Sequence, residues 1–176
     1  LGQRDRALQA TEEKYRTFVE QSIAGIWFVR FDQAIPVDLP PDEQARRIIK
    51  FSRLEDCNDA LAQMYGYSSR DQMLGRPWFA SDTEQSRNEY PQNVLHFIES
   101  GYQTRNFETQ EVTSDGRSVN FLSNVVGILE QDHLTGIWGA QVDITQSKKM
   151  EMALSRTEAR TRGLLNAIPD MIFELR

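Results

Sequence analysis

Few side chains in this sequence are of the kinds that perform catalysis, and they lie far apart. The chain has one cysteine, Cys57, and two histidines, His96 and His133. A zinc site needs several cysteine or histidine ligands at short spacings, and a nucleophilic centre needs a base beside the nucleophile. The sequence has no glycine-rich phosphate-binding loop or catalytic motif, and nothing in it pairs two of its carboxylates. We therefore expect no enzyme activity and no metal ion in this chain.

The two histidines are also poorly placed to hold a haem. A haem iron needs an axial histidine that faces a cavity. His96 lies on a predicted helix, about 100° around the axis from Leu95, which we assign to the apolar stripe of that helix. His133 falls in the predicted turn Gln131-Asp132-His133. The positions of both histidines argue against haem.

The composition limits the classes of protein and partner. Apolar residues make up 39% of the 176 residues and aromatic residues 10%, which is enough for the core of one domain of roughly 125 residues between helical ends. The net charge of −6 argues against nucleic acid as a partner. A single cysteine excludes an internal disulfide and predicts a cytoplasmic location. No apolar run is long enough to span a membrane, so we expect no direct membrane contact here, although the parent protein could be membrane-anchored.

Both ends of the sequence carry helical patterns with a narrow apolar seam. An isolated helix of this length is marginal in water, so each seam needs a partner. We expect one helix over residues 1–21, a second over 147–168, and a parallel homodimer formed through them. The seam residues recur at steps of three and four, the spacing of a coiled coil: Leu8, Thr11, Tyr15, Phe18 and Ser22, and then Met150, Leu154, Thr157, Thr161, Leu164 and Ile168.

The pattern between the two seams alternates between strand and helix signals. The long helix is predicted over Glu84–Glu99, with Gly101 as its C-terminal stop, and Ser114-Asp115-Gly116 is a tight-turn signal. Residues 32–50 predict a proline-stiffened loop followed by a short helix. The order predicts an α+β domain, a five-stranded antiparallel sheet with short helices and one longer helix on one face. The predicted strands are Gly25–Phe31, Phe51–Cys57, Arg105–Thr113, Ser118–Glu130 and His133–Ile144.

The junction between the last strand and the C-terminal helix has a helix-capping pattern. The Thr145 hydroxyl can accept from free N–H groups at the start of the helix, and Asp143 places negative charge near the positive end of the helix dipole. A switch needs a defined joint between two stiff parts. We therefore predict that Asp143 and Thr145 couple the sheet to the C-terminal helix.

The end of the sequence resembles its beginning. Residues Glu158–Arg176 align without a gap on Glu12–Arg30, with four identities and with apolar residues at matching positions. Such self-similarity is typical of tandem arrays. We expect residues 169–176 to start a second domain of the same kind, with a short apolar strand.

Four short passages follow the pattern of one known family, in its order and spacing. The passages are Asn58-Asp59-Ala60 with Gly66-Tyr67-Ser68, then Met73-Leu74-Gly75-Arg76-Pro77, then Asp115-Gly116 before Phe121, and lastly Gly139 before Asp143-Ile144-Thr145. Together they cover about residues 22–147, and they resemble a PAS domain, the sensory module of bacterial signalling proteins.

The resemblance implies a PAS fold over residues 22–146, with a cavity between sheet and helices where relatives hold small ligands. In this chain the cavity is expected either to be a filled apolar core or to take a small apolar or planar ligand. The candidate wall residues are Phe28, Leu54, Met64, Leu95, Ile98, Phe107, Phe121, Val125 and Trp138.

The sequence departs from the family pattern in two places. Residues 32–50 form an insertion between the first two strands, which is expected to be a lid, an interface element or a neutral addition. A light-sensing flavin adduct would need a cysteine after the Gly75-Arg76 pair, and the chain has Pro77-Trp78 there. The cofactor, if any, is therefore unknown, with a flavin adduct disfavoured.

By this resemblance, the chain is expected to relay a signal through its coiled-coil helices to an output domain. The favoured output is the histidine kinase of a two-component system, and a cyclic-dinucleotide synthase is the alternative. A second hypothesis is a ligand-free spacer and dimerisation unit in the same array.

Overall fold

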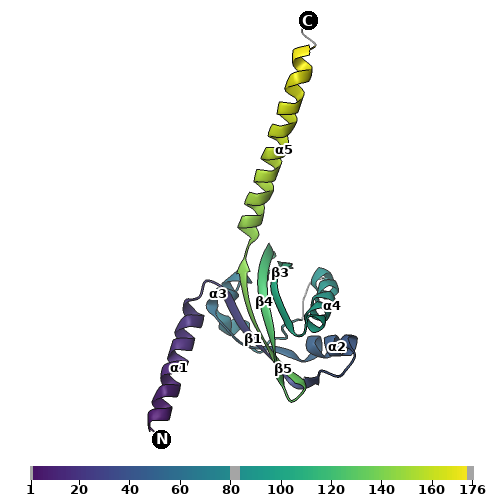
Figure 1. Cartoon of the computed structure of the whole chain (residues 1–176). Helices are drawn as coiled ribbons and strands as arrows, with labels where there is room; N and C mark the ends of the chain where they lie inside the picture. The colour runs from purple at the N-terminus through teal and green to yellow at the C-terminus, as the bar shows by residue number, and fades with distance from the viewer. Residues whose placement is uncertain (1, 80–83, 174–176) are drawn as a thin grey trace. The chain divides into compact units, whose positions relative to one another are not determined.

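The backbone is described for residues 2–79 and 84–173 in a computed structural model. The chain divides into two compact units, Leu1–Asp143 and Ile144–Arg176. The first unit contains the sheet and most of the helices, and the second contains one long helix (Figure 1).

The first unit is built on a five-stranded antiparallel sheet in the order β2-β1-β5-β4-β3. This confirms the predicted α+β class. β1 was expected to end at Phe31, but it continues to Pro36 because its pairing with β5 resumes after a register shift between Arg30 and Ile35. The strands are β1 (Gly25–Pro36), β2 (Ser52–Cys57), β3 (Gln103–Val112), β4 (Ser118–Glu130) and β5 (His133–Asp143).

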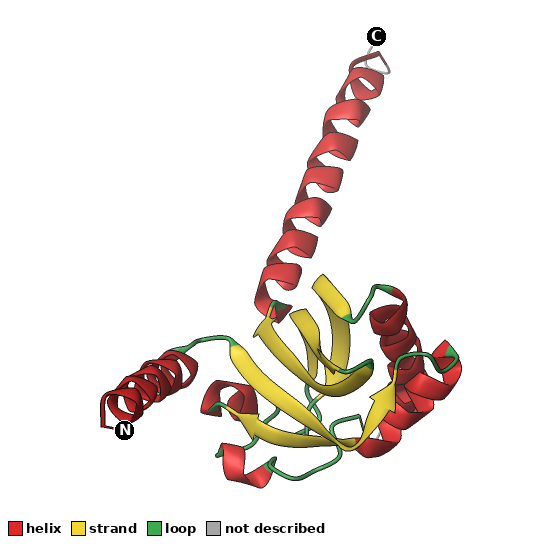
Figure 2. Cartoon of the chain, turned by 60° about the horizontal axis from the view of Figure 1, so that its bottom comes forward, coloured by secondary structure: helices red, strands yellow, loops and turns green. Residues whose placement is uncertain are grey.

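The short helices cover one face of this sheet (Figure 2). α4 has the predicted bounds, and Gly101 follows it with a φ of +72°, a left-handed conformation that glycine adopts without strain. Asn58 caps α3, where its side-chain oxygen accepts from the backbone N–H of Leu61. The helices are α2 (Pro41–Phe51), α3 (Asp59–Met64), the 3-10 turn η1 (Arg70–Gln72) and α4 (Glu84–Glu99).

The insertion at residues 32–50 supplies α2, and this helix belongs to the domain core. Ala45 and Ile48 are buried in the main apolar cluster, and α2 packs against α4. The buried Gln44 donates to the carbonyls of Val37 and Leu39 and accepts from the Tyr102 hydroxyl at 2.7 Å. These contacts fasten the insertion to the segment that follows α4.

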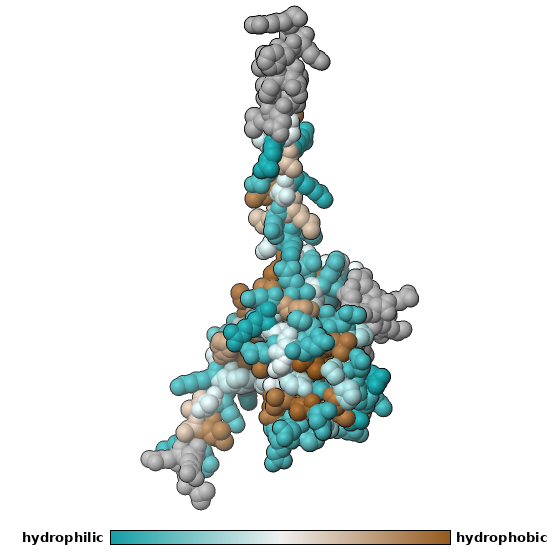
Figure 3. Space-filling view, turned by 45° about the vertical axis from the view of Figure 1, so that its right-hand side comes forward, coloured by the Kyte–Doolittle hydropathy of each residue, from teal (hydrophilic) through white to brown (hydrophobic). Residues whose placement is uncertain are grey.

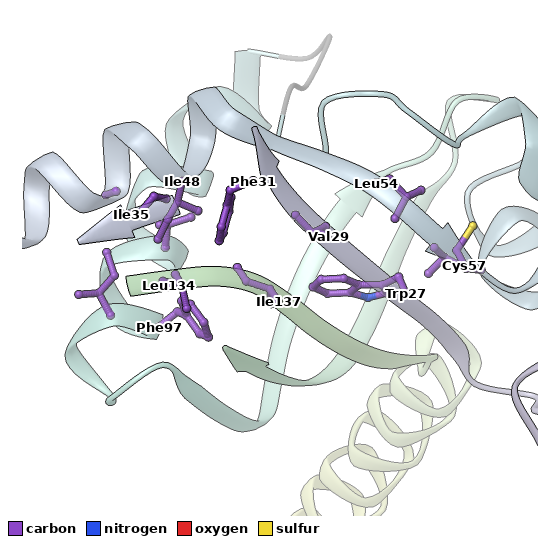
Figure 4. Packing of buried hydrophobic residues seen from close by; sticks show 14 of the residues in the cluster. Trp27, Val29, Phe31, Ile35, Ile48, Leu54, Cys57, Phe97, Leu134 and Ile137 are labelled. Carbon is purple, nitrogen blue, oxygen red and sulfur yellow. The ribbon is translucent and has the colours of Figure 1, made fainter. Parts of the chain in front are cut away.

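The core lies between the inner face of the sheet and these helices (Figure 4). Successive strand residues point to opposite faces, so Trp27, Val29 and Phe31 of β1 point inward together. They meet Ile137 from β5 and, from the helical layer, Ile48 and Phe97. Burial of these side chains is the main contribution to the stability of the unit.

Two terminal helices carry the exposed seams. In α1 (Gly2–Gln21), Leu8 and Phe18 are exposed, while Val19 is buried. In α5 (Thr145–Phe173), Leu154 and Leu164 are each 61% exposed. Figure 3 shows brown and tan patches among hydrophilic residues along both terminal helices. Among the residues described, no helix is long and apolar enough to cross a membrane.

α5 is longer than the sequence predicted. It was expected to end at Ile168 and to give way to a strand, but residues 170–173 continue the helix. A strand needs a neighbour to satisfy its backbone groups, whereas a helix satisfies them internally. The rest of the predicted strand, residues 174–176, lies outside the described residues, and the start of a second domain at 169–176 stays a prediction.

Candidate ligand-binding site

A cavity of about 660 Å³ lies against the inner face of the sheet. All five strands contribute to its lining, together with α4 and the chain from Tyr65 to Phe79. Its volume is within the range of sites that bind small molecules. The pairing of the strands fixes the face of the sheet to which each of these side chains points.

Aromatic side chains form much of this wall. The ring centroids of Trp27 and Trp78 are 4.8 Å apart, and Tyr65 contacts Trp78 edge-on at 5.9 Å. Trp27 can lie flat over β5 because Gly139 is opposite it in the β1–β5 register. A Cβ atom on Gly139 would be 2.1 Å from the indole ring, so only glycine fits beneath it.

A chain of hydrogen bonds crosses one side of the cavity. The Trp27 Nε1 donates to the Gln141 Oε1 at 3.1 Å, and the Gln141 Nε2 donates to the Tyr65 hydroxyl at 3.3 Å. The Tyr65 hydroxyl donates to the Glu111 Oε2 at 2.8 Å, and Thr109 donates to the Glu111 Oε1. The indole N–H is a donor only, so it fixes which way the Gln141 amide points. The chain of bonds therefore has a defined direction, from Trp27 to Glu111.

The structure brings three of the predicted wall residues to the cavity, namely Leu54, Phe107 and Val125. Phe121 is fully buried and stacks beside Tyr65 at 5.3 Å. The remaining side chains near the helices pack elsewhere in the unit: Ile98 and Leu95 belong to the packing around α4, and Met64 lies next to Gly25.

Phe28 and Trp138 lie on the outer face of the sheet. They are opposite each other in the β1–β5 register, and their rings stack at 4.7 Å. Tyr15 of α1 meets Trp138 edge-on at 6.1 Å. Their neighbours Trp27 and Ile137 line the cavity, so the prediction chose the wrong one of two adjacent apolar residues on each strand.

Four principal cavity residues were absent from the predicted wall: Trp27, Tyr65, Trp78 and Gln141. The period of two in β1 contains the signal for Trp27, since it shares a face with Val29 and Phe31. Gln141 follows Ile137 and Gly139 at the same period. No sequence pattern indicates that Tyr65 reaches Gln141, because that contact depends on how α3 packs on the sheet.

The predicted coupling residues lie at the junction of the two units. Asp143 is the last residue of β5 and is exposed. α5 begins at Thr145, so Thr145 is the first residue of the helix and not the residue before it. The N–H of Lys148 donates to the carbonyl of Ile144 in the first turn. The coupling role of Asp143 and Thr145 stays a prediction.

The histidines and the cysteine lie apart in the structure. His96 is exposed and stacks on Phe107 at 5.2 Å, and the Nδ1 of His133 is 2.8 Å from the carbonyl oxygen of Gln131. Cys57 is 2% exposed at the end of β2. Among the described residues, no three histidine, cysteine, aspartate or glutamate side chains are grouped so as to hold a metal ion.

The thiol of Cys57 is expected to be unreactive in the native state. Burial, together with the Asp56 carboxylate, raises its pKa from 9.0 to about 12. The thiolate is the reactive form, so iodoacetamide at pH 8 should alkylate the native chain at least about 100-fold more slowly than the unfolded chain. Mass spectrometry of timed samples measures this ratio. Equal rates in the two states would contradict the burial of Cys57.

The same pKa shift fixes the sign of a pH effect on stability. Above pH 9 the unfolded chain releases the Cys57 proton while the native chain keeps it, so the unfolded state gains stability. The contribution of Cys57 to stability is therefore present below about pH 9 and is lost as the pH rises towards 12.

A sheet in this strand order, with helices around a cavity on one face, defines the fold of a sensory module. A family model described as "PAS domain" matches residues 48–146. The chain belongs to the PAS family, and its folded unit is a PAS sensory domain.

Solved structures show the same fold. The PAS domain of a protein from Colwellia psychrerythraea has a TM-score of 0.56 at 18% identity and covers 77% of this chain and 98% of its own. An RNA-binding light-oxygen-voltage receptor has a TM-score of 0.53 at 15% identity, and the match covers 86% of this chain and 38% of the receptor chain. A domain of a sensory box sensor histidine kinase/response regulator from Geobacter sulfurreducens has a TM-score of 0.50 at 20% identity. That match covers 77% of this chain and 96% of the Geobacter domain. A search of curated proteins found no match.

Proposed function

We propose that this chain is the sensory and dimerising module of a larger signalling protein, in which a small ligand in the cavity changes the output of a downstream domain. The cavity of about 660 Å³, with its aromatic walls and directed hydrogen bonds, is the observation that carries this proposal. The histidine kinase of a two-component system is our choice of output, in a cytoplasmic setting, and a cyclic-dinucleotide synthase is the alternative. The module itself is expected to catalyse nothing.

A thermal-shift screen tests the sensing role. A ligand that binds only the native state raises the melting temperature, by an amount that increases with the ligand's concentration and affinity. The chain should respond in this way to at least one member of a library of small metabolites. A Val125→Trp variant, which fills the cavity from β4, should fold and lose the response. If no compound stabilises the chain, the sensing role fails.

The second candidate is a ligand-free spacer, and one observation favours it. Among the described residues, every fully buried polar side-chain atom already has a hydrogen-bond partner without any ligand. A domain of this kind can be stable with its cavity empty. If the domain is a spacer, no compound in the screen should raise the melting temperature of the wild-type chain or of Val125→Trp.

We propose that the flanking helices join two copies of the chain. Met150 and Leu154 are about 60% exposed on the α5 seam, and Met152 is equally exposed away from it. A charge on the seam must be desolvated in a coiled coil, whereas a charge off the seam stays in water. We expect Leu154→Glu to weaken dimerisation at least about tenfold and Met152→Glu to leave it unchanged.

Sedimentation equilibrium over a range of protein concentrations measures this effect. Equal effects of the two variants, or a wild-type chain that stays monomeric at high concentration, would refute the proposed dimer.

Asp143 and Thr145 are our proposed coupling residues between sheet and helix. A Thr145→Ala variant of the parent protein should therefore lose stimulus-dependent output, and unchanged output would refute that role.

A further inference from the structure

Arg76 is the one cationic residue among the described residues that line the cavity. Its Nη1 donates to the Tyr67 hydroxyl at 3.0 Å, and its guanidinium lies 5.3 Å from the centre of the Tyr67 ring. No carboxylate pairs with Arg76 within the part of the chain that the structure describes. Other arginines of this unit do form carboxylate pairs, namely Arg30, Arg46, Arg47, Arg53, Arg70 and Arg117.

The backbone holds Arg76 in place at the edge of the sheet. The N–H of Leu54 in β2 donates to the Arg76 carbonyl at 2.9 Å, and the N–H of Gly75 donates to the Leu54 carbonyl at 2.7 Å. Gly75 has a φ of +77°, which a side chain there would resist. The Arg76 side chain is exposed, and its contacts with Tyr67 keep the guanidinium at this edge, within reach of a ligand in the cavity.

The acidic residue of the lining lies at the other edge of the sheet. Glu111 is on β3, whereas Arg76 pairs with β2, and these are the two outermost strands. The wall between them is neutral: aromatic rings, Gln141, and hydroxyl side chains such as Thr104 and Ser123. A ligand with one negative charge therefore finds attraction at the Arg76 edge and repulsion at the Glu111 edge.

We propose that the cavity binds a planar ring compound that bears a carboxylate. The ring lies against Trp27 and Trp78, and the carboxylate binds the guanidinium of Arg76. A guanidinium has five N–H donors in a planar fork that matches the two oxygens of a carboxylate, and Tyr67 takes one of them. A single cation suits a monoanion better than a phosphate dianion. This inference rests on the proposed sensing function.

Isothermal titration calorimetry with three probes on one ring tests the inference. The probes are 2-naphthoate, 2-naphthamide and 2-naphthylmethylamine, which differ in charge and little in shape. The wild-type chain should bind the carboxylate at least about tenfold more tightly than the amide, since charge-assisted hydrogen bonds are about twice as strong as neutral ones. The amine should bind more weakly than the amide.

An Arg76→Gln variant should bind the carboxylate and the amide equally, with the amide affinity unchanged. Arg105→Gln is the matched control, because Arg105 is exposed on β3 and is not among the lining residues. It should behave as wild type. A carboxylate preference that survives Arg76→Gln overturns the inference, as does an absence of binding by all three probes. Tighter binding of the amide or the amine also overturns it, but leaves the sensing function standing.

Discussion

Replacement of Asn58 by aspartate should lower the free energy of unfolding by about 4 kcal/mol. The Asn58 side chain is fully buried and makes four hydrogen bonds. Its Oδ1 accepts from the N–H groups of Ile26 and Leu61, and its Nδ2 donates to the carbonyls of Val19 and Ala24. Aspartate keeps the acceptor but turns the donor into an oxygen that faces two carbonyl oxygens.

The effect is large because one side chain fastens three elements. Val19 is in the last turn of α1, where helical carbonyls lack intrahelical partners. Ile26 is the second residue of β1, and Leu61 is in the first turn of α3. Asn58→Ala leaves these four backbone groups, two of them in buried bonds, without their partner and should cost about 3 kcal/mol.

Urea denaturation followed by circular dichroism measures both variants. Asp59→Ala is the control, because Asp59 is adjacent but exposed and accepts one bond from the N–H of Arg70. It should change stability by less than about 1 kcal/mol. If Asn58→Ala stays within the range of this control, the account of how α1 is attached is wrong.

Replacement of Gly139 by alanine should destabilise the domain by about 3 kcal/mol. The new methyl group would be 2.1 Å from the Trp27 ring, so the ring must leave its place over β5. Trp27 would then lose its bond to Gln141 and its contact with Trp78. We expect the cavity wall to collapse together with the loss of stability.

A double-mutant cycle separates this mechanism from a general strand effect. In a Trp27→Leu background the clash is gone, so Gly139→Ala should cost less than about 1 kcal/mol. Gly163→Ala on α5 is a control with open space around it, and it should be neutral or slightly stabilising. Additive effects of Trp27→Leu and Gly139→Ala would contradict the direct contact between the two positions.

Local signals predicted much of the fold. The bounds of α4 and the turn at Gly116, which has a φ of +81°, each depend on a few neighbouring residues, and the structure agrees with them. The length of β1 was not predictable in this way. Its extension to Pro36 depends on pairing with β5, a strand far along the chain.

The cavity wall was harder to predict than the fold for the same reason. A strand with apolar residues on both faces, such as Trp27 beside Phe28, does not reveal which face points inward. The choice depends on the partner strand, where Gly139 makes room for Trp27 and Trp138 stacks on Phe28. Arg76 stands in a motif that the sequence did identify, but only the packing of Tyr67 shows where its guanidinium lies.

Native mass spectrometry of freshly purified chain tests the central claim, that the cavity holds a small ligand, most directly. We predict that part of the wild-type protein carries extra mass from one or a few small molecules, which denaturing conditions release. Val125→Trp, prepared in parallel, should show the mass of the bare chain, since the added indole fills the space. Wild-type protein that is reproducibly bare, or extra mass that Val125→Trp retains, would contradict a ligand site in this cavity.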